Sequence, residues 1–146
     1  MDVFSRTFLP AAAEAGVALA TVSRHMPIFR RCVETDDTTV LVGRCVRPDA
    51  PMAGEYLLVL TYRRLVVTQE TRVLHRLRLH LNAHLRHLSN VTWNPDPGRS
   101  ALEVAATAVD GVRERFRLRL AEPDAVWRSD ALLRHVFRGA AVPAAA

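Results

Sequence analysis

The sequence predicts an α+β domain in which about seven short antiparallel strands are preceded by an N-terminal helical extension and followed by a C-terminal capping helix. Extended, β-branched segments separated by turn residues fill positions 39–120. An amphipathic stretch follows Pro123, and an alanine-rich stretch precedes the strands. The 146 residues suffice for one domain with its own core. We expect residues 1–37 to form the extension and a connector, residues 38–138 the main domain, and residues 139–146 a flexible tail.

The N-terminal extension is expected to be helical over residues 11–24, with Pro10 in its first turn. Gly16 weakens this helix, and Pro27 is expected to end it because proline has no amide hydrogen to donate. A short second turn follows at residues 28–31. The sequence does not determine whether the extension docks on the strands.

The strands are predicted from their β-branched and apolar residues and from the turn residues between them. Asp110 and Gly111 are the clearest turn and predict a two-residue hairpin. The terminal helix is expected to begin at Pro123 and to end at Gly139. The expected strands lie at residues 39–46, 56–60, 65–68, 76–84, 85–93, 101–109 and 112–120.

Residues 74–88 fit two secondary structures. Apolar and polar residues alternate there, which predicts a strand with Leu79 and Leu81 on one face and His80 on the other. Leucines at a spacing of three to four residues in the same stretch also fit a helix. We expect a strand through Leu81 because the neighbouring segments are extended, and the helix stays open as the alternative.

The basic residues are all arginine, with 20 arginines and no lysine against 15 acids, a net charge of +5. The absence of lysine, together with many alanines and valines, indicates a GC-rich genome and not a binding function. The excess positive charge lies between Tyr56 and Pro95, where six arginines stand against one acid, Glu70. This local patch, and not the overall charge, is the feature that points to a ligand.

The segment Tyr56–Thr61, followed by a short turn and Arg63–Val67, resembles a strand hairpin of the pleckstrin-homology-like (PH-like) superfamily, specifically of small bacterial PH-like and GRAM-like domains. The resemblance continues through Leu79–Val91 and the hairpin at Asp110, and it covers residues 38–138. It implies a bent antiparallel barrel of seven strands with one end plugged by the final helix. Domains of this kind dock lipids, peptides or proteins and are rarely enzymes.

One loop departs from the phosphoinositide-binding members of that superfamily. Residues 48–54, where those members are rich in cations, hold Asp49 and no cation. Arg44 and Arg47 lie only at the edge of this loop. Inositol-phosphate binding there is therefore not expected.

Two sets of basic residues on the strands form a candidate anion-binding surface. One set shares a face of the predicted strand at residues 76–84; the other occupies alternate positions on residues 112–120, opposite Phe116 and Leu118. If both sets share one face of the sheet, they would bind nucleic acid or acidic lipid headgroups. The alternative is an exposed strand face that arginine keeps soluble. The candidate anion-binding residues are Arg76, Arg78, His80, Arg113, Arg115, Arg117 and Arg119.

Four histidines, His75, His80, His84 and His87, cluster in and beside the predicted strand at residues 76–84. On a helix, His80, His84 and His87 would share a face and could hold zinc. On a strand, His80 and His84 lie about 13 Å apart, too far for one metal. We therefore expect solvated histidines and no metal site.

The sequence holds no pattern typical of catalysis, neither a glycine-rich phosphate loop nor a serine or H-E-x-x-H motif. Cys32 and Cys45 are expected to be buried, reduced thiols. We predict a non-catalytic binding or adaptor module in the cytoplasm, with no cofactor and no transmembrane segment. The expected partner is another protein, contacted through the sheet edge or the N-terminal helix. Anion binding is the alternative, a histidine metal site is the third, and the oligomeric state is left open.

Overall fold

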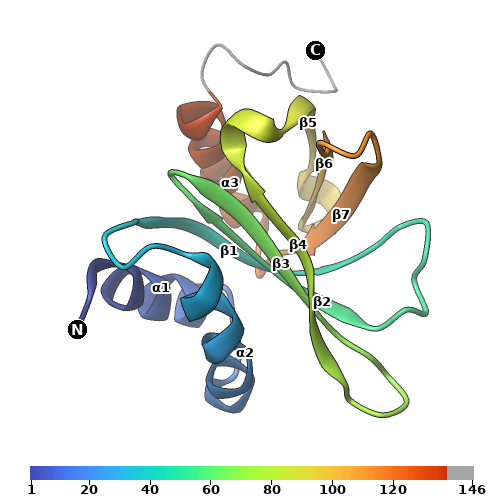
Figure 1. The fold of residues 1–146 in the computed structure, drawn as a ribbon. Helices are drawn as coiled ribbons and strands as arrows, with labels where there is room; N and C mark the ends of the chain where they lie inside the picture. The colour runs from blue at the N-terminus through green and yellow to red at the C-terminus, as the bar shows by residue number, and fades with distance from the viewer. Residues whose placement is uncertain (138–146) are drawn as a thin grey trace.

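The computed structural model describes residues 1–137 and shows one strongly bent sheet with α-helices on both sides (Figure 1). Helices α1 (Val3–Glu14) and α2 (Leu19–Cys32) precede the sheet, and α3 (Pro123–Val136) follows it. The strands are β1 (Thr39–Val46), β2 (Glu55–Thr61), β3 (Arg64–Glu70), β4 (Leu77–His84), β5 (Ser89–Asp96), β6 (Ala101–Thr107) and β7 (Arg113–Arg119); the 3-10 helices η1 (Leu85–His87) and η2 (Pro97–Arg99) flank β5.

All neighbouring strands are antiparallel, in the order β4-β3-β2-β1-β7-β6-β5. The sheet bends between its two halves, so that β1–β4 and β5–β7 face one another as in a barrel (Figure 1). The predicted α+β class is confirmed, with seven antiparallel strands in one bent sheet, a C-terminal capping helix and an N-terminal helical extension. Within the ambiguous residues 74–88, residues 77–84 form β4 and residues 85–87 form η1, so a strand, and not a long helix, is correct there.

The inner face of the sheet and α3 enclose the first hydrophobic core, which contains Leu133 and Phe137 from the end of the chain. The ring of Trp93 lies beside that of Phe137, with centroids 6.2 Å apart. The buried indole N–H of Trp93 donates to Oδ1 of the buried Asp130 at 2.9 Å, and Arg134 donates to Oδ2 at 3.0 Å. These bonds fix α3 across the end of the barrel, since a buried indole N–H without an acceptor is costly.

The outer face of β1, β2 and β3 is covered by α1 and α2, which form a second hydrophobic core with it. Three aromatic rings lie at its centre: Phe4 is 5.3 Å from Phe8, and Phe8 is 5.5 Å from Phe29, between centroids. Leu57 and Val59 of β2 point into this core. The N-terminal extension therefore docks on the sheet, a point that the sequence left open.

The extension breaks at Gly16, whereas the sequence predicted one helix over residues 11–24 that ends at Pro27. Gly16 has a φ of +76°, the left-handed conformation that glycine adopts without a steric cost. Pro10 and Pro27 lie inside α1 and α2 and are exposed. Each proline removes one helical hydrogen bond on the side that faces water, where solvent replaces it. The prediction was wrong because it took Pro27, and not Gly16, as the residue that interrupts the helical segment.

The loop between β6 and β7 has three residues, not the predicted two. The Ala108 N–H donates to the Val112 carbonyl at 2.9 Å, which leaves residues 109–111 in the loop. Gly111 has a φ of +84°, as the last residue of a three-residue hairpin loop requires. Asp110 and Gly111 lie in this loop as predicted, and only the predicted number of loop residues was wrong.

The remaining predictions about the chain concern its thiols and its end. Both cysteines are free; Cys45 is buried, and burial raises the pKa of its thiol, whereas Cys32 is half-buried. The predicted helix end at Gly139 and the tail at residues 139–146 lie outside the described residues. Within residues 1–137, no helix is long and apolar enough to cross a membrane.

One buried polar contact joins α2 to the sheet. His25 is buried and its Nδ1 lies 2.7 Å from Oγ1 of Thr68 on β3, while its Nε2 lies 3.7 Å from a Glu70 oxygen. Burial lowers the pKa of the His25 imidazole; Arg24 lowers it further, whereas Glu70 raises it. The folded protein therefore favours the neutral imidazole.

We predict that the free energy of unfolding falls as the pH drops below about 6.5, the ordinary histidine pKa, because the unfolded chain then binds a proton that the folded His25 resists. The slope contributed by this one residue is at most about 1.4 kcal/mol per pH unit, and this contribution to stability is complete above pH 6.5. Urea unfolding between pH 5 and pH 8 measures it. His25→Asn, which keeps a polar group towards Thr68, should flatten the profile, and the exposed control His87→Asn should not. Equal profiles for wild type and His25→Asn would refute the assignment.

We predict that Asp130→Ala lowers the free energy of unfolding by about 2–3 kcal/mol, because it leaves the buried Trp93 N–H without an acceptor. Asp124→Ala is the matched control, an exposed acid in the first turn of the same helix, and should cost less than about 1 kcal/mol. Urea denaturation followed by tryptophan fluorescence gives both values. Equal losses for the two variants would contradict the role given to the Trp93–Asp130 bond.

Candidate functional site

The predicted alternation of β4 is interrupted at His80 by a change of register. Val67 pairs with Leu81 and Thr68 pairs with Leu79, so His80 is an extra residue in β4, a β-bulge. Leu81 therefore packs on the first core, while Leu79 lies on the opposite face and is 43% exposed. The expectation that Leu79 and Leu81 share a face was wrong, because one extra residue reverses the alternation beyond it.

The bulge turns His80 into the mouth of the barrel. Its ring lies edge-on to those of Tyr56 and Phe116, at centroid distances of 5.2 and 5.9 Å. Its Nε2 lies 2.9 Å from Oε1 of Glu114 on β7, and Arg47 lies 3.6 Å from the same oxygen. His80 therefore links β4 to β7 across the barrel and does not belong to an exposed basic face.

The two arginines predicted to accompany His80 lie in different surroundings. Arg78 points to the inner side of the sheet, where its Nε donates to Gln69 at 2.7 Å. Arg76 lies before β4, and its side chain is exposed. The structure does not bring this predicted set together.

The arginines of β7 share the outer face of the sheet, as their alternation indicates, but most are paired with acids. Arg115 contacts Glu103 at 2.6 Å, and this hydrogen bond raises the pKa of Arg115. Arg113 donates instead to the Asn90 carbonyl and to two threonine hydroxyls. The other two pairs are Arg117 with Asp96 at 3.2 Å and Arg119 with Glu55 at 3.1 Å. These carboxylates neutralise much of the stripe, and it faces away from Arg78 and His80.

The histidines of the sequence cluster are dispersed. His75 lies 3.9 Å from a Glu70 oxygen in the loop before β4, and His80 lies inside the barrel. The rings of His84 and His87 are 5.8 Å apart, and partial burial followed by Arg86 and Arg64 lowers the pKa of His84. Among residues 1–137, no group of three or more potential ligands could hold a metal ion.

Two loops lie side by side at one end of the sheet (Figure 1): residues 47–54 between β1 and β2, and residues 71–76 between β3 and β4. The side-chain amide of Gln69, near the end of β3, donates to the Ala53 carbonyl at 2.7 Å and ties the first loop to that strand. Gly54 has a φ of +117°, and a Cβ there would collide with the backbone of β3. Glycine at this position is therefore what allows the loops to approach so closely.

These loops carry exposed apolar and basic side chains. Met52 is 71% exposed, Val73 88% and Leu74 65%. Arg72 and Arg76 flank the last two, and within residues 1–137 neither guanidinium has an ion pair or a hydrogen bond. We call Met52, Arg72, Val73, Leu74 and Arg76 the tip.

The loop between β3 and β4 holds its part of the tip in a closed hairpin. The Thr71 N–H donates to the Arg76 carbonyl at 2.9 Å, and the Arg76 N–H donates to Oγ1 of Thr71 at 3.0 Å. No motif in the sequence pointed to the tip. Its available signal was two adjacent apolar residues between arginines, with no acid, in a short connection between strands.

Comparison with known proteins identifies a related fold. No family model and no curated protein matches this chain. Among solved structures the chain is similar to the hSac2 domain from human phosphoinositide phosphatase Sac2, with 13% sequence identity and a TM-score of 0.56 over 85% of this chain and 86% of that one. At this identity the similarity shows a shared fold over most of both chains.

Proposed function

We propose that this chain is a non-catalytic PH-like binding module, of the bacterial PH-like kind that the sequence resembles, and that it docks through the tip on an acidic membrane surface. The observation that carries the proposal is the pairing of exposed Val73 and Leu74 with two arginines that have no acidic partner among residues 1–137. A cytoplasmic location is part of the proposal, since the cytoplasmic leaflet carries anionic lipids.

The two kinds of side chain have complementary roles at a membrane. Burial of Met52, Val73 and Leu74 in the headgroup region removes apolar surface from water. Arg72 and Arg76 then lie at the level of the lipid phosphates, where each basic residue adds to the attraction. The closed hairpin between β3 and β4 presents Arg72, Val73 and Leu74 on a backbone that is already ordered.

Two further observations agree with a lipid surface. The similar solved domain comes from a phosphoinositide phosphatase. The tip has no aromatic side chain on which a nucleic-acid base could stack, and the arginines of β7 are largely paired with acids.

Docking on another protein, which the sequence analysis favoured, is the second candidate. The observation that favours it is the position of β4 at the edge of the sheet, with Leu79 43% exposed. An edge strand can accept a strand of a partner, and a neighbouring apolar side chain adds contact area. Leu79→Asp should abolish such docking and leave membrane binding intact, which separates the two candidates.

We predict that the protein co-sediments with phosphatidylserine-containing vesicles and not with phosphatidylcholine vesicles, and that raising the salt concentration weakens the binding. Arg72→Gln/Arg76→Gln should reduce the affinity at least about tenfold and reduce its salt dependence. Arg6→Gln/Arg99→Gln is the matched control, since both arginines are exposed and have no ion pair among residues 1–137. Equal binding by the two double variants would sink the proposal.

We predict a separate apolar contribution. Val73→Asp should reduce vesicle binding at least about tenfold, because a carboxylate replaces an apolar group in the headgroup region. Val109→Asp is the control, because Val109 is 86% exposed in the loop between β6 and β7 and lies outside the tip. Sedimentation at a fixed lipid concentration compares them, and equal losses would mean that the tip does not enter the membrane.

A further inference from the structure

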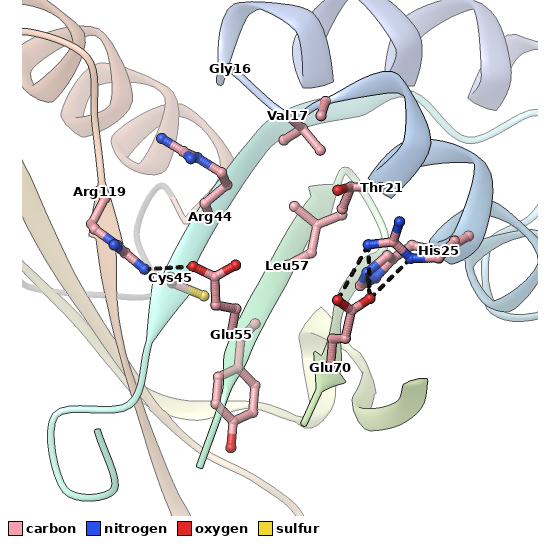
Figure 2. A pocket seen from close by; sticks show the side chains of 13 residues that line it. Gly16, Val17, Thr21, His25, Arg44, Cys45, Glu55, Leu57, Glu70 and Arg119 are labelled. Carbon is pink, nitrogen blue, oxygen red and sulfur yellow. Dashed lines mark hydrogen bonds and ion pairs between the residues drawn. The ribbon is translucent and has the colours of Figure 1, made fainter. Parts of the chain in front are cut away.

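A pocket of about 170 Å³ lies on the outer face of the sheet, between the start of α2 and the strands β1, β2 and β7 (Figure 2). Gly16, Ala18 and Thr21 border it on the helical side. Arg44 and Arg119 border it on the sheet side. This volume is large enough for a small anion.

Arg44 and Arg119 are direct cross-strand partners in the β1–β7 ladder. Both point to the outer face, as Leu57, the β2 partner of Arg44, does. Like charges directly opposite one another destabilise a sheet unless an anion compensates them. The register therefore places two guanidinium groups side by side at the wall of a pocket.

Among residues 1–137, the negative charge that compensates these two arginines is incomplete. Arg44 is exposed, has no hydrogen bond or ion pair within residues 1–137, and extends towards the turn at Gly16 (Figure 2). Arg119 contacts Glu55 at 3.1 Å, but the Glu55 side chain is 75% exposed, so this is a weak surface pair. Arg24 and Glu70, the other charged pair of the pocket, contact one another at 3.0 Å. Two arginines thus share one carboxylate.

We propose that this pocket binds the phosphoryl group of a phosphate monoester, between the guanidinium groups of Arg44 and Arg119. A single guanidinium fork satisfies a carboxylate, whereas two adjacent forks match the several oxygens and the double charge of a phosphate monoester. The first turn of α2 borders the same space, and no side chain caps it. Its free N–H groups add positive potential to the site that the arginines define.

Glu55 competes with the ligand for Arg119. A bound phosphoryl group takes the position on Arg119 that Glu55 occupies, and the exposed carboxylate moves into solvent at little cost. This competition gives the site an unusual property: removal of an acid that is already ion-paired should strengthen it.

The test is isothermal titration calorimetry of the full chain with inorganic phosphate and with glycerol 3-phosphate, at an ionic strength held constant with sodium chloride. Arg44→Gln should weaken binding at least about tenfold, and Glu55→Gln should strengthen it about threefold to fivefold. Arg117→Gln is the matched control, two residues from Arg119 on the same face of β7 but outside the pocket, and should bind as wild type. Absence of phosphate binding to wild type, or equal affinities for wild type and Arg44→Gln, would overturn the proposal.

A structural role for Arg44 makes a different prediction, namely loss of stability on substitution. We expect the melting temperature of Arg44→Gln without ligand to equal or exceed that of wild type, because a like-charge pair is removed. A lower melting temperature would mean that Arg44 stabilises the fold, and it would count against the site.

Vesicle binding by the Arg44→Gln variant tests whether the phosphoryl group belongs to a lipid or to a soluble molecule. If it belongs to a lipid, Arg44→Gln should weaken binding to phosphatidic acid vesicles and not to phosphatidylserine vesicles of equal charge. If it belongs to a soluble molecule, Arg44→Gln should weaken glycerol 3-phosphate binding and neither vesicle type. Arg72→Gln/Arg76→Gln at the tip should leave glycerol 3-phosphate binding unchanged, so this site and membrane docking can fail independently.

Discussion

Burial of β2 on both of its faces dictates how the helices and the other strands are placed. Alternate residues of this strand point into two different cores, so neither face can be left to water. Helix α3 and the second half of the sheet cover one face, and α1 and α2 cover the other. The N-terminal helices are therefore a structural layer of the domain and not an appendage. The residues of β2 that face the first core are Tyr56, Leu58 and Leu60, and those that face the second are Leu57 and Val59.

This second layer also shapes the surfaces available for binding. Because the turn at Gly16 and the first turn of α2 border the outer face of the sheet, they convert part of that face into a pocket beside Arg44 and Arg119. On the other side, the bulge at His80 connects β4 to β7 through Glu114 and closes the mouth of the barrel. The loops beyond that mouth are left with exposed apolar side chains, because no element among residues 1–137 covers them.

Local sequence patterns predicted the positions of the strands well, but they predicted less well which face of the sheet each side chain occupies. The seven strands and the start of α3 lie within a few residues of their expected positions, because turn residues and alternation act over short distances. The continuous apolar run of β2 also indicates burial on both faces, which requires a second layer such as the N-terminal helices to cover the outer face. The face of His80 could not be predicted, since the bulge that sets it depends on the pairing of β4 with β3.

The candidate binding sites likewise depend partly on local sequence and partly on contacts between distant segments. Residue type and spacing along the chain are enough to indicate which segments are extended, where the hairpins turn, and that the positive charge is uneven. Tertiary structure decided which charges remain available: it paired the β7 arginines with acids that are distant in sequence, and it turned His80 inward. It also set Arg44 opposite Arg119, 75 positions later in the chain. An ion pair or a like-charge pair between strands depends on register, and register is fixed only when the whole sheet has formed.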